Sequence, residues 1–308
     1  MYHIIVNPAS RSGKGLKIWQ ETLEPTLKRY DVEYQVYFSE KSGDVGELAE
    51  NILQSFPDEI LSFIILGGDG TVNEFLQGAE DLTRVRLGYI PSGSGGDLAR
   101  SLHIPQDPAK ALELILQTSD THALDVGVVD FAEGKSLRFA VSCGIGYDAN
   151  VCEEVARSGL KKVLNRMGLG KLIYLSIALK QIITSKSVDC TLTIDGKSPI
   201  SMKRLLFIAI MVHRYEGGGF LFCPDADACD GILNLCTAFN LPKMVIPFIL
   251  PTAFWGKHFR FKNIDPYTGT HITIEAPIPL WVHTDGEVRY QSCGLSITCM
   301  KQALHMYF

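Results

Sequence analysis

The sequence predicts two domains: an α/β N-terminal domain with an open parallel sheet, and a mainly antiparallel β-sandwich C-terminal domain. Two observations predict this fold class. The first 120 or so residues alternate short apolar segments with longer amphipathic ones, whereas short alternating strands dominate after about Ala123. Strands that alternate with helices must pair in parallel, because each crossover places a helix on a face of the sheet. The chain has 308 residues, enough for both domains.

The N-terminal elements follow from the positions of the apolar segments. The expected strands are residues 2–6, 33–37, 61–66 and 86–90. The expected helices are residues 15–30, 44–54, a helix that opens at Thr71, 97–102 and 108–117. Ligands of open parallel sheets bind beyond the carboxyl ends of the strands, so the loops after these strands are the expected place for a site.

The C-terminal part has strand-like segments with two helical inserts. The expected strands are residues 138–142, 190–194, 205–212, 272–274 and 280–283, and the inserts are residues 159–186 and 241–255. We expect the first domain to span residues 1–124 and the second to span 125–292. The tail, from about residue 293 to 308, is expected to pack back on the first domain.

Composition and charge exclude several classes of protein. Hydrophobic residues make up 46% and charged residues 20% of the chain, which is typical of an ordered globular protein. The net charge of −5 argues against a nucleic-acid partner. The chain has no C-x-x-C pair and no H-E-x-x-H motif, so a zinc site is not expected. The first residues lack the pattern of a signal peptide, and we expect a cytoplasmic protein.

The strongest motif is a glycine-rich turn after the third strand, Gly67-Gly68-Asp69-Gly70, which leads into a helix at Thr71. Glycines let phosphate oxygens approach the backbone, and the start of a helix favours an anion. A carboxylate in such a loop indicates a bridging Mg²⁺. The motif matches neither a P-loop nor a dinucleotide fingerprint, and the alternative is a plain tight turn.

Two further loops follow neighbouring strands. Asn7-Pro8 comes after the first strand, and the segment from Pro91 to Asp97 comes after the fourth. Because the carboxyl ends of parallel strands meet at one edge of the sheet, we expect all three loops to converge at one crevice.

In these motifs the chain resembles the diacylglycerol kinase family of lipid kinases, which includes bacterial soluble diacylglycerol kinases and the catalytic region of sphingosine kinases. The resemblance continues in order through Asp125-Val126-Gly127, residues 144–149, residues 217–231 and Asp285-Gly286-Glu287. It implies an N-terminal fold like those of NAD kinase and 6-phosphofructokinase. It also implies ATP as the phosphate donor, Mg²⁺ as the cofactor, a lipid-binding second domain, and phosphorylation of a lipid hydroxyl, with diacylglycerol as the preferred acceptor and phospholipid synthesis as the setting.

The resemblance also assigns residues to the nucleotide. The residues that it places at ATP are Asn7, Pro8, Lys14, Ser39, Gly67, Gly68, Gly70, Thr71, Ser92, Gly93, Ser94, Gly95, Asp97 and Arg100. Asp69 and Asp97 are implied to hold Mg²⁺ at the phosphates, while Lys14 and Arg100 balance the phosphate charge. Ordinary surface charge is the alternative for those two cations.

Asp285 is implied to be the general base, with Glu287 beside it, and Asp69 is the other candidate to accept the proton. An Asp-Gly pair alone is a common turn, which is the structural alternative. We expect this loop and the phosphate loops to face the same cleft.

A second metal site is implied by the segment around Asp230. In bacterial members of the family a similar loop holds a structural Mg²⁺, which would here be bound through Asp227, Asp230 and Ile232. The alternative is a solvated acidic turn.

Gly96 is a departure from the family pattern, which has asparagine at this position. Because of this departure, one alternative to a lipid kinase is a catalytically weak sensor that binds a nucleotide or a lipid. The other alternative is a kinase for a soluble acceptor, similar to NAD kinase.

Membrane contact is expected from residues 157–186, which contain seven Lys or Arg residues and no Asp or Glu. A basic amphipathic helix can lie on anionic lipid, which predicts peripheral association with the inner face of the membrane. A core helix with solvated lysines is the alternative.

The sequence leaves open whether the protein forms a homodimer.

Overall fold

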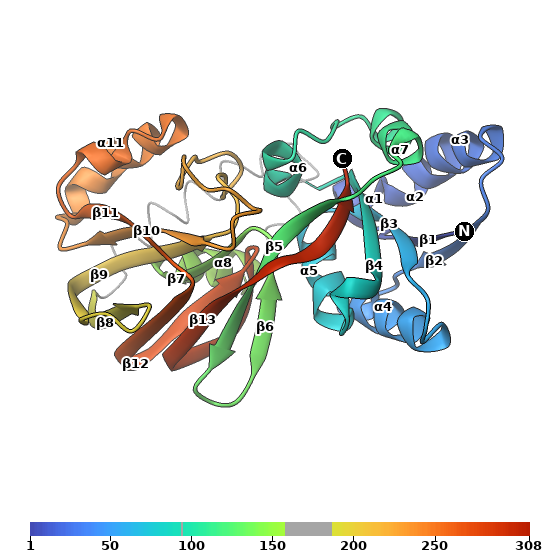
Figure 1. The fold of residues 1–308 in the computed structure, drawn as a ribbon. Coiled ribbons are helices and arrows are strands. Elements are labelled where there is room, and N and C mark those ends of the chain that lie inside the picture. Colours follow the sequence, from blue (N-terminus) through green and yellow to red (C-terminus); the bar gives the residue numbers. More distant parts are fainter. Residues whose placement is uncertain (94, 158–186) are drawn as a thin grey trace. The chain divides into compact units, whose positions relative to one another are not determined.

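The structure is a computed structural model that describes residues 1–93, 95–157 and 187–308 (Figure 1). Ser94 and most of the expected basic helix, from residue 158 to 186, lie outside the described residues. The chain divides into two compact units, which are described separately below. The first unit contains Met1–Val126 and Lys301–Phe308, and the second contains Gly127–Met300.

The sheet of the first unit is parallel, as predicted. Its strands are β1 (Tyr2–Val6), β2 (Tyr34–Phe38), β3 (Leu61–Gly67) and β4 (Val85–Pro91). They lie in the order β2-β1-β3-β4, and the end of β13 (Glu287–Tyr307) adds parallel to β4. The central strands are almost wholly apolar and buried, as expected for strands covered on both faces.

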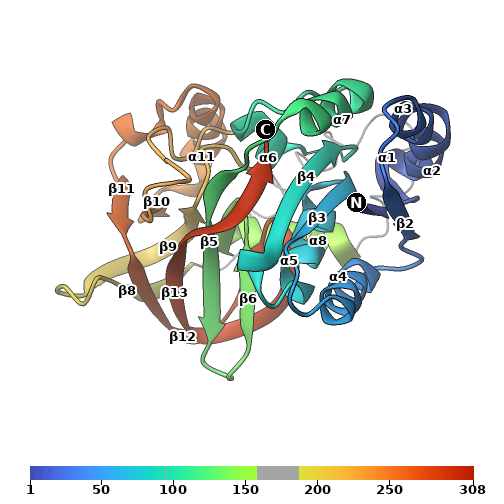
Figure 2. The same ribbon diagram turned by 45° about the vertical axis from the view of Figure 1, so that its right-hand side comes forward.

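Helices cover both faces of this sheet. They are α1 (Ser10–Gly13), α2 (Gly15–Ile18), the π-helix η1 (Trp19–Leu23), α3 (Glu24–Arg29), α4 (Asp44–Ser55), α5 (Asp69–Gly78), the 3₁₀-helix η2 (Leu82–Arg84), α6 (Asp97–Ser101) and α7 (Pro108–Gln117). In both views α4 and α5 lie together on one side of the sheet, and α2, α3 and α7 lie on the other (Figures 1 and 2). The expected helix over residues 15–30 contains a π-helical turn, and α5 begins at Asp69, before the predicted Thr71.

The second unit is built from antiparallel strands, as predicted. They are β5 (His122–Phe131, which begins in the first unit), β6 (Ser136–Phe139), β7 (Ser142–Gly146), β8 (Val188–Ile194), β9 (Ile200–Met211), β10 (Leu233–Phe239), β11 (Ile264–Gly269), β12 (His271–Thr284) and most of β13. The pairs β7–β9, β7–β12, β9–β10 and β12–β13 are all antiparallel. Buried Ile, Leu, Val and Phe side chains from these strands form the core.

The helical parts of the second unit differ from the prediction. The helix α8 (Tyr147–Arg157) directly follows β7 and was not predicted. The expected insert at residues 241–255 is a series of short turns: η3 (Lys243–Val245), α11 (Ile246–Ile249) and η4 (Leu250–Trp255), followed by η5 (His258–Arg260). Pro242, Pro247 and Pro251 each lack a backbone N–H, which prevents one regular helix. Among the described residues, no helix is long and apolar enough to span a bilayer.

Candidate functional site

The loops after β1, β3 and β4 meet at the carboxyl edge of the parallel sheet. Asn7 Nδ2 donates a hydrogen bond to Thr71 Oγ1 at 3.2 Å, and the Gly68 N–H donates to the same oxygen at 3.2 Å. The Ser92 N–H donates to the Gly67 carbonyl at 2.7 Å. Short polar contacts therefore join three segments that are distant in the sequence.

The glycines of these loops are required for packing. A Cβ added at Gly93 would lie 2.7 Å from Gly68 Cα, and one at Gly67 would lie 2.4 Å from Thr71 Oγ1. The two loop backbones therefore touch, and a side chain would force them apart.

Asp69 is held from two sides at the start of α5. The Tyr89 hydroxyl donates to Oδ1 at 3.1 Å, and the Asp97 N–H donates to Oδ2 at 3.0 Å. Tyr89 is fully buried, and burial together with the adjacent Asp69 raises its pKa well above the usual value. The Tyr89 hydroxyl thus stays protonated and fixes the carboxylate. Sequence reasoning missed Tyr89, whose only signal is a hydroxyl group in an otherwise apolar strand.

Several other predicted nucleotide residues are near this carboxylate. A Cβ added at Gly95 would lie 3.2 Å from Asp69 Oδ2. Asp97 is buried at the start of α6 and forms an ion pair with Arg100 on the next turn. Asp97 thus engages one of the two cations expected to face phosphate.

The remaining predicted nucleotide residues lie at the ends of the same elements. Pro8 follows β1, and exposed Lys14 is the N-cap of α2. Ser39 follows β2 and donates its N–H to the Val6 carbonyl at 3.0 Å. Gly70 is in the first turn of α5.

Gly96 has a left-handed backbone, with φ 67° and ψ 34°, and caps α6. Glycine and asparagine are the residues that adopt this conformation most readily. A Cβ here would meet only the Gln106 amide, at 3.5 Å. Both glycine and the asparagine of the family pattern can therefore adopt the backbone conformation found at this position.

Asp285 and Gly286 form the tight turn between β12 and β13. Both have positive φ, 51° and 81°, and Thr284 pairs with Glu287 across the turn. Two left-handed residues are the requirement of the preferred two-residue hairpin turn, which explains the Asp-Gly sequence. Glu287 is exposed.

The Asp285 carboxylate binds main-chain amides. It accepts N–H groups from Ala140 at 2.9 Å, Val141 at 2.8 Å and Ser142 at 3.0 Å, and its own N–H donates to the Ser142 carbonyl at 2.8 Å. The carboxylate therefore anchors the turn to the segment that enters β7. To act as a base it would have to accept a proton from a substrate hydroxyl in addition to these amide hydrogen bonds.

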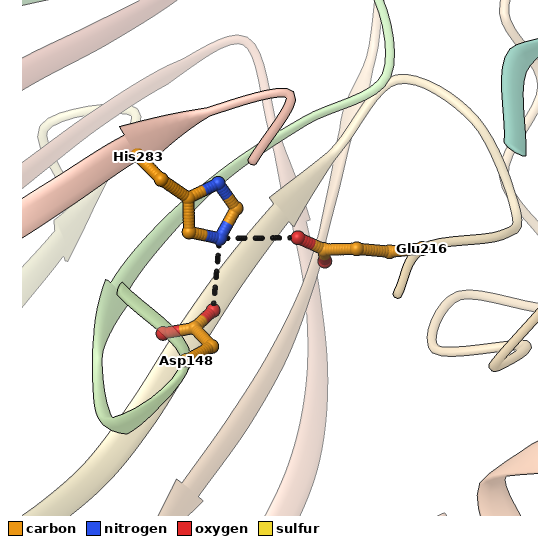
Figure 3. A group of neighbouring side chains, drawn as sticks. All are labelled: Asp148, Glu216 and His283. Carbon is orange, nitrogen blue, oxygen red and sulfur yellow. Dashed lines mark hydrogen bonds and ion pairs between the residues drawn. The ribbon is translucent and has the colours of Figure 1, made fainter. Parts of the chain in front are cut away.

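A partly buried cluster that the sequence did not predict lies beside this turn (Figure 3). His283 Nε2 is 3.3 Å from Asp148 Oδ2 and 3.1 Å from Glu216 Oε1. His283 is the penultimate residue of β12, Asp148 is the second residue of α8, and Glu216 lies in the segment between β9 and β10. The Gly286 N–H, in the Asp-Gly turn, donates to His283 Nδ1 at 3.2 Å. The cluster thus contacts the turn through His283.

Protonation of the cluster follows from these contacts. Because Nδ1 accepts the Gly286 amide, the neutral ring carries its proton on Nε2 and donates it to the carboxylates. Burial raises the pKa of Asp148. Burial opposes a charge on His283, but Cys152, Asp148 and Glu216 together raise its pKa well above the usual value. The neighbouring carboxylates therefore favour a charged ring, whereas the Gly286 hydrogen bond requires an unprotonated Nδ1. Because the two requirements oppose each other, the protonation of His283 is coupled to the conformation of the turn.

The same cluster could in principle hold a metal ion. Within the described parts of the chain, it is the one place where three or more His, Cys, Asp or Glu side chains lie close enough together to do so. The separations resemble the edges of a tetrahedral site, about 3.3 Å for bonds of about 2.0–2.1 Å. A metal on Nε2, however, requires the proton on Nδ1, where the Gly286 amide already donates. The structure favours a hydrogen-bonded cluster over a metal site.

The side chains of the expected structural Mg²⁺ loop cap local turns. Asp227 Oδ1 accepts the Cys229 N–H at 3.0 Å, and Asp230 Oδ1 accepts the Ile232 N–H at 2.8 Å. The Ile232 carbonyl, the expected third ligand, lies 3.5 Å from Asn234 Nδ2. These contacts are those expected of a solvated acidic turn, which was the alternative interpretation. Binding of a structural Mg²⁺ by these residues stays a prediction.

Replacing Gly144 with alanine is expected to disrupt the cluster. The new Cβ would lie 2.0 Å from His283 Nε2 and 2.2 Å from Asp148 Oδ2, so the strand or the ring must move. We expect the free energy of unfolding to fall by about 1–3 kcal/mol, measured by urea denaturation. Gly294→Ala is the matched control, because its Cβ would make an ordinary 3.5 Å contact with Ala132. Equal stability of the two variants would contradict the assigned packing.

Two family descriptions match the chain in tandem. The diacylglycerol kinase catalytic domain matches residues 1–129. The YegS C-terminal NAD kinase beta sandwich-like domain matches residues 141–308, and this second match alone covers more than half of the chain. The chain belongs to the diacylglycerol kinase family. Membership confirms the predicted resemblance and supports phosphotransferase chemistry.

Named relatives and solved structures agree with this membership. The chain is 26% identical over 283 residues to a diacylglycerol kinase of Mycobacterium tuberculosis, covering 92% of this chain and 87% of that one. A diacylglycerol kinase of Staphylococcus haemolyticus is 27% identical over 288 residues, covering 92% and 81%.

Two solved structures share the fold. One is a crystal structure of a diacylglycerol kinase from Bacillus anthracis, with a TM-score of 0.71, 20% identity and coverage of 100% and 96%. The other is an NAD kinase from Archaeoglobus fulgidus in complex with ATP, with a TM-score of 0.53, 13% identity and coverage of 100% and 94%. These likenesses confirm the predicted fold class.

Proposed function

We propose that this protein transfers the γ-phosphate of ATP to a lipid hydroxyl at the inner face of the membrane, with diacylglycerol as the acceptor and phosphatidic acid as the product. The observation that carries the proposal is the position of Asp69. It lies on a glycine-rich turn at the carboxyl edge of a parallel sheet, held between the Tyr89 hydroxyl and the Asp97 amide. Family membership and relatives named diacylglycerol kinase support the choice of acceptor.

The nucleotide is assigned to the first unit. Close packing at Gly67, Gly68 and Gly93 brings two loops together at the start of the ten-residue helix α5, whose positive dipole end favours a phosphate. Asp69 and Asp97 supply the carboxylate oxygens that suit Mg²⁺, which when bound neutralises phosphate charge. Exposed Lys14 is proposed to contact the phosphates directly.

The acceptor hydroxyl is assigned to the second unit. Asp285 is proposed to accept its proton, with Asp69 as the competing candidate and exposed Glu287 as the neighbouring carboxylate. Most of the rate acceleration in phosphoryl transfer comes from positioning and charge neutralisation, and a general base adds typically about 10²–10⁴-fold. The fixed position of Asp285 favours an orienting role for its carboxylate in addition to proton transfer.

The test is to incubate the purified protein with labelled ATP, Mg²⁺ and a total lipid extract, and to identify the labelled product. Labelled phosphatidic acid is the expected product. Labelled NADP formed from added NAD, with no labelled lipid, would replace the proposal with the soluble-acceptor alternative. Tight binding of ATP without turnover on any lipid would favour the sensor alternative.

A further inference from the structure

The segment between β10 and β11 exposes four large apolar side chains within twelve residues. Met244 is 80% exposed, Phe248 78%, Phe254 48% and Trp255 68%. We call these four residues the aromatic face. Several large apolar side chains exposed within one short segment make that segment a candidate interaction surface.

The aromatic face is presented by ordered backbone. The opposite side of the same segment is buried, through Ile246, Ile249 and Ala253. The Leu221 N–H donates to the Ala253 carbonyl at 2.9 Å, and the Phe254 ring stacks on Phe220 with centroids 4.1 Å apart. The segment is therefore packed on the rest of its unit, and its outward side chains are not exposed by a loose loop.

A small apolar cavity lies behind the segment, against β9, β10 and β11. Its lining includes Phe207, Phe222, Ala238 and Ile264, and its volume is about 30 Å³. A cavity of this size holds roughly two water molecules and is too small for an acyl chain. The segment thus offers its outer surface, rather than an internal pocket, to a partner.

The charged residues within the segment that carries the aromatic face have one sign. No Asp or Glu occurs between Gly231 and Ile264, although the whole chain has a net charge of −5. Lys257, Arg260 and Lys262 are exposed within this stretch. Exposed aromatic residues beside Lys and Arg match the chemistry of an anionic bilayer surface, where the rings sit at the headgroup level and the cations meet the phosphates.

We propose that the aromatic face, with Lys257, Arg260 and Lys262, docks on a bilayer that contains anionic lipid. A second copy of the chain fits less well, because a two-fold interface would set this positive surface against itself. The proposal rests on the proposed function, since it gives the kinase direct access to lipid. The contact uses only the second unit and does not depend on residues 158–186.

The first experiment is flotation of the full chain with phosphatidylcholine vesicles, with and without phosphatidylglycerol. Binding is expected to need phosphatidylglycerol and to weaken with salt. The double variants F248S/W255S and K257Q/R260Q are each expected to bind these vesicles about tenfold more weakly than the wild type, or weaker still. The matched controls are I60S, which removes an apolar side chain that is 63% exposed in the first unit, and K197Q, which removes an exposed cation. Both controls are expected to bind like the wild type.

A second measurement does not depend on the stability of variants. Brominated lipid chains in the vesicles are expected to quench the fluorescence of Trp255. The other two tryptophans, Trp19, which is 3% exposed, and Trp281 in β12, are expected to stay unquenched. Trp255→Phe should abolish most of the quenching. Wild-type binding by F248S/W255S, or no quenching of Trp255, would overturn the proposal. Self-association that F248S/W255S abolishes, without vesicle binding, would overturn it in favour of a dimer interface.

The outcomes separate this proposal from the lipid kinase function. Vesicle binding that depends on the aromatic face, without phosphorylation of any lipid, keeps the docking surface and refutes the kinase assignment. Lipid phosphorylation with unchanged vesicle binding in F248S/W255S keeps the kinase and refutes the docking surface. If both hold, F248S/W255S loses turnover on vesicles but retains it on a short-chain diacylglycerol dispersed in water.

Discussion

Asp285→Asn is expected to lower the free energy of unfolding by about 2–3 kcal/mol and to remove most of the kinase activity. The carboxylate accepts the N–H groups of Ala140, Val141 and Ser142. An asparagine amide offers one oxygen and two hydrogens, so at least one of these N–H groups would face another donor and the charge-assisted bonds would be lost. Urea denaturation measures the stability change.

Glu287→Gln is the matched control for stability, because Glu287 is exposed and adjacent to the same turn. Its expected stability change is within about 0.5 kcal/mol. Activity must be compared below the unfolding temperature of both variants, so that unfolding does not count as lost catalysis. Folded D285N with wild-type turnover would refute Asp285 as the base and leave the anchor role, and wild-type stability would refute the anchor.

Asp69→Asn is expected to reduce turnover by at least about 10²-fold with a stability change of only about 1 kcal/mol. The carboxylate charge would be lost from the glycine-rich turn. An asparagine oxygen can still accept a hydrogen bond from Tyr89 or from the Asp97 amide, so the local packing is retained. Initial rates with saturating ATP, Mg²⁺ and diacylglycerol measure the effect.

Tyr89→Phe tests how much the positioning of the Asp69 carboxylate, as distinct from its charge, contributes to turnover. It removes the hydrogen bond to Oδ1 but keeps the carboxylate, and we expect a smaller loss of turnover, about tenfold. Tyr307→Phe is the control: it also removes a side-chain hydrogen bond, to Ser62, but at the opposite end of β3. Full turnover in D69N would contradict the assigned site, and equal rates in Y89F and Y307F would contradict the positioning role of Tyr89.

The sequence predicted the parallel sheet well, because its strands are continuous apolar runs. Residues 2–6 form β1 as predicted, and the strand expected at 61–66 is β3 with one more residue. Strands buried on both faces need apolar residues at nearly every position, so their signal is strong. The helix α8 carries charged residues, including Glu153 and Glu154, and has no comparable signal. The insert at 241–255 was misjudged because three prolines outweigh its apolar composition.

The sequence by itself determined the class of the fold and the glycine-rich turn at Gly67 to Gly70. Both follow from local order along the chain: an apolar strand, then glycines, then a helix. Only the tertiary structure decided which side chains meet in the second unit. His283 and Asp148 are 135 positions apart, and they meet because antiparallel pairing sets His283 opposite Gly144, where the absent side chain leaves room for the ring. Register between distant strands is a property of the whole sheet, and no local pattern encodes it.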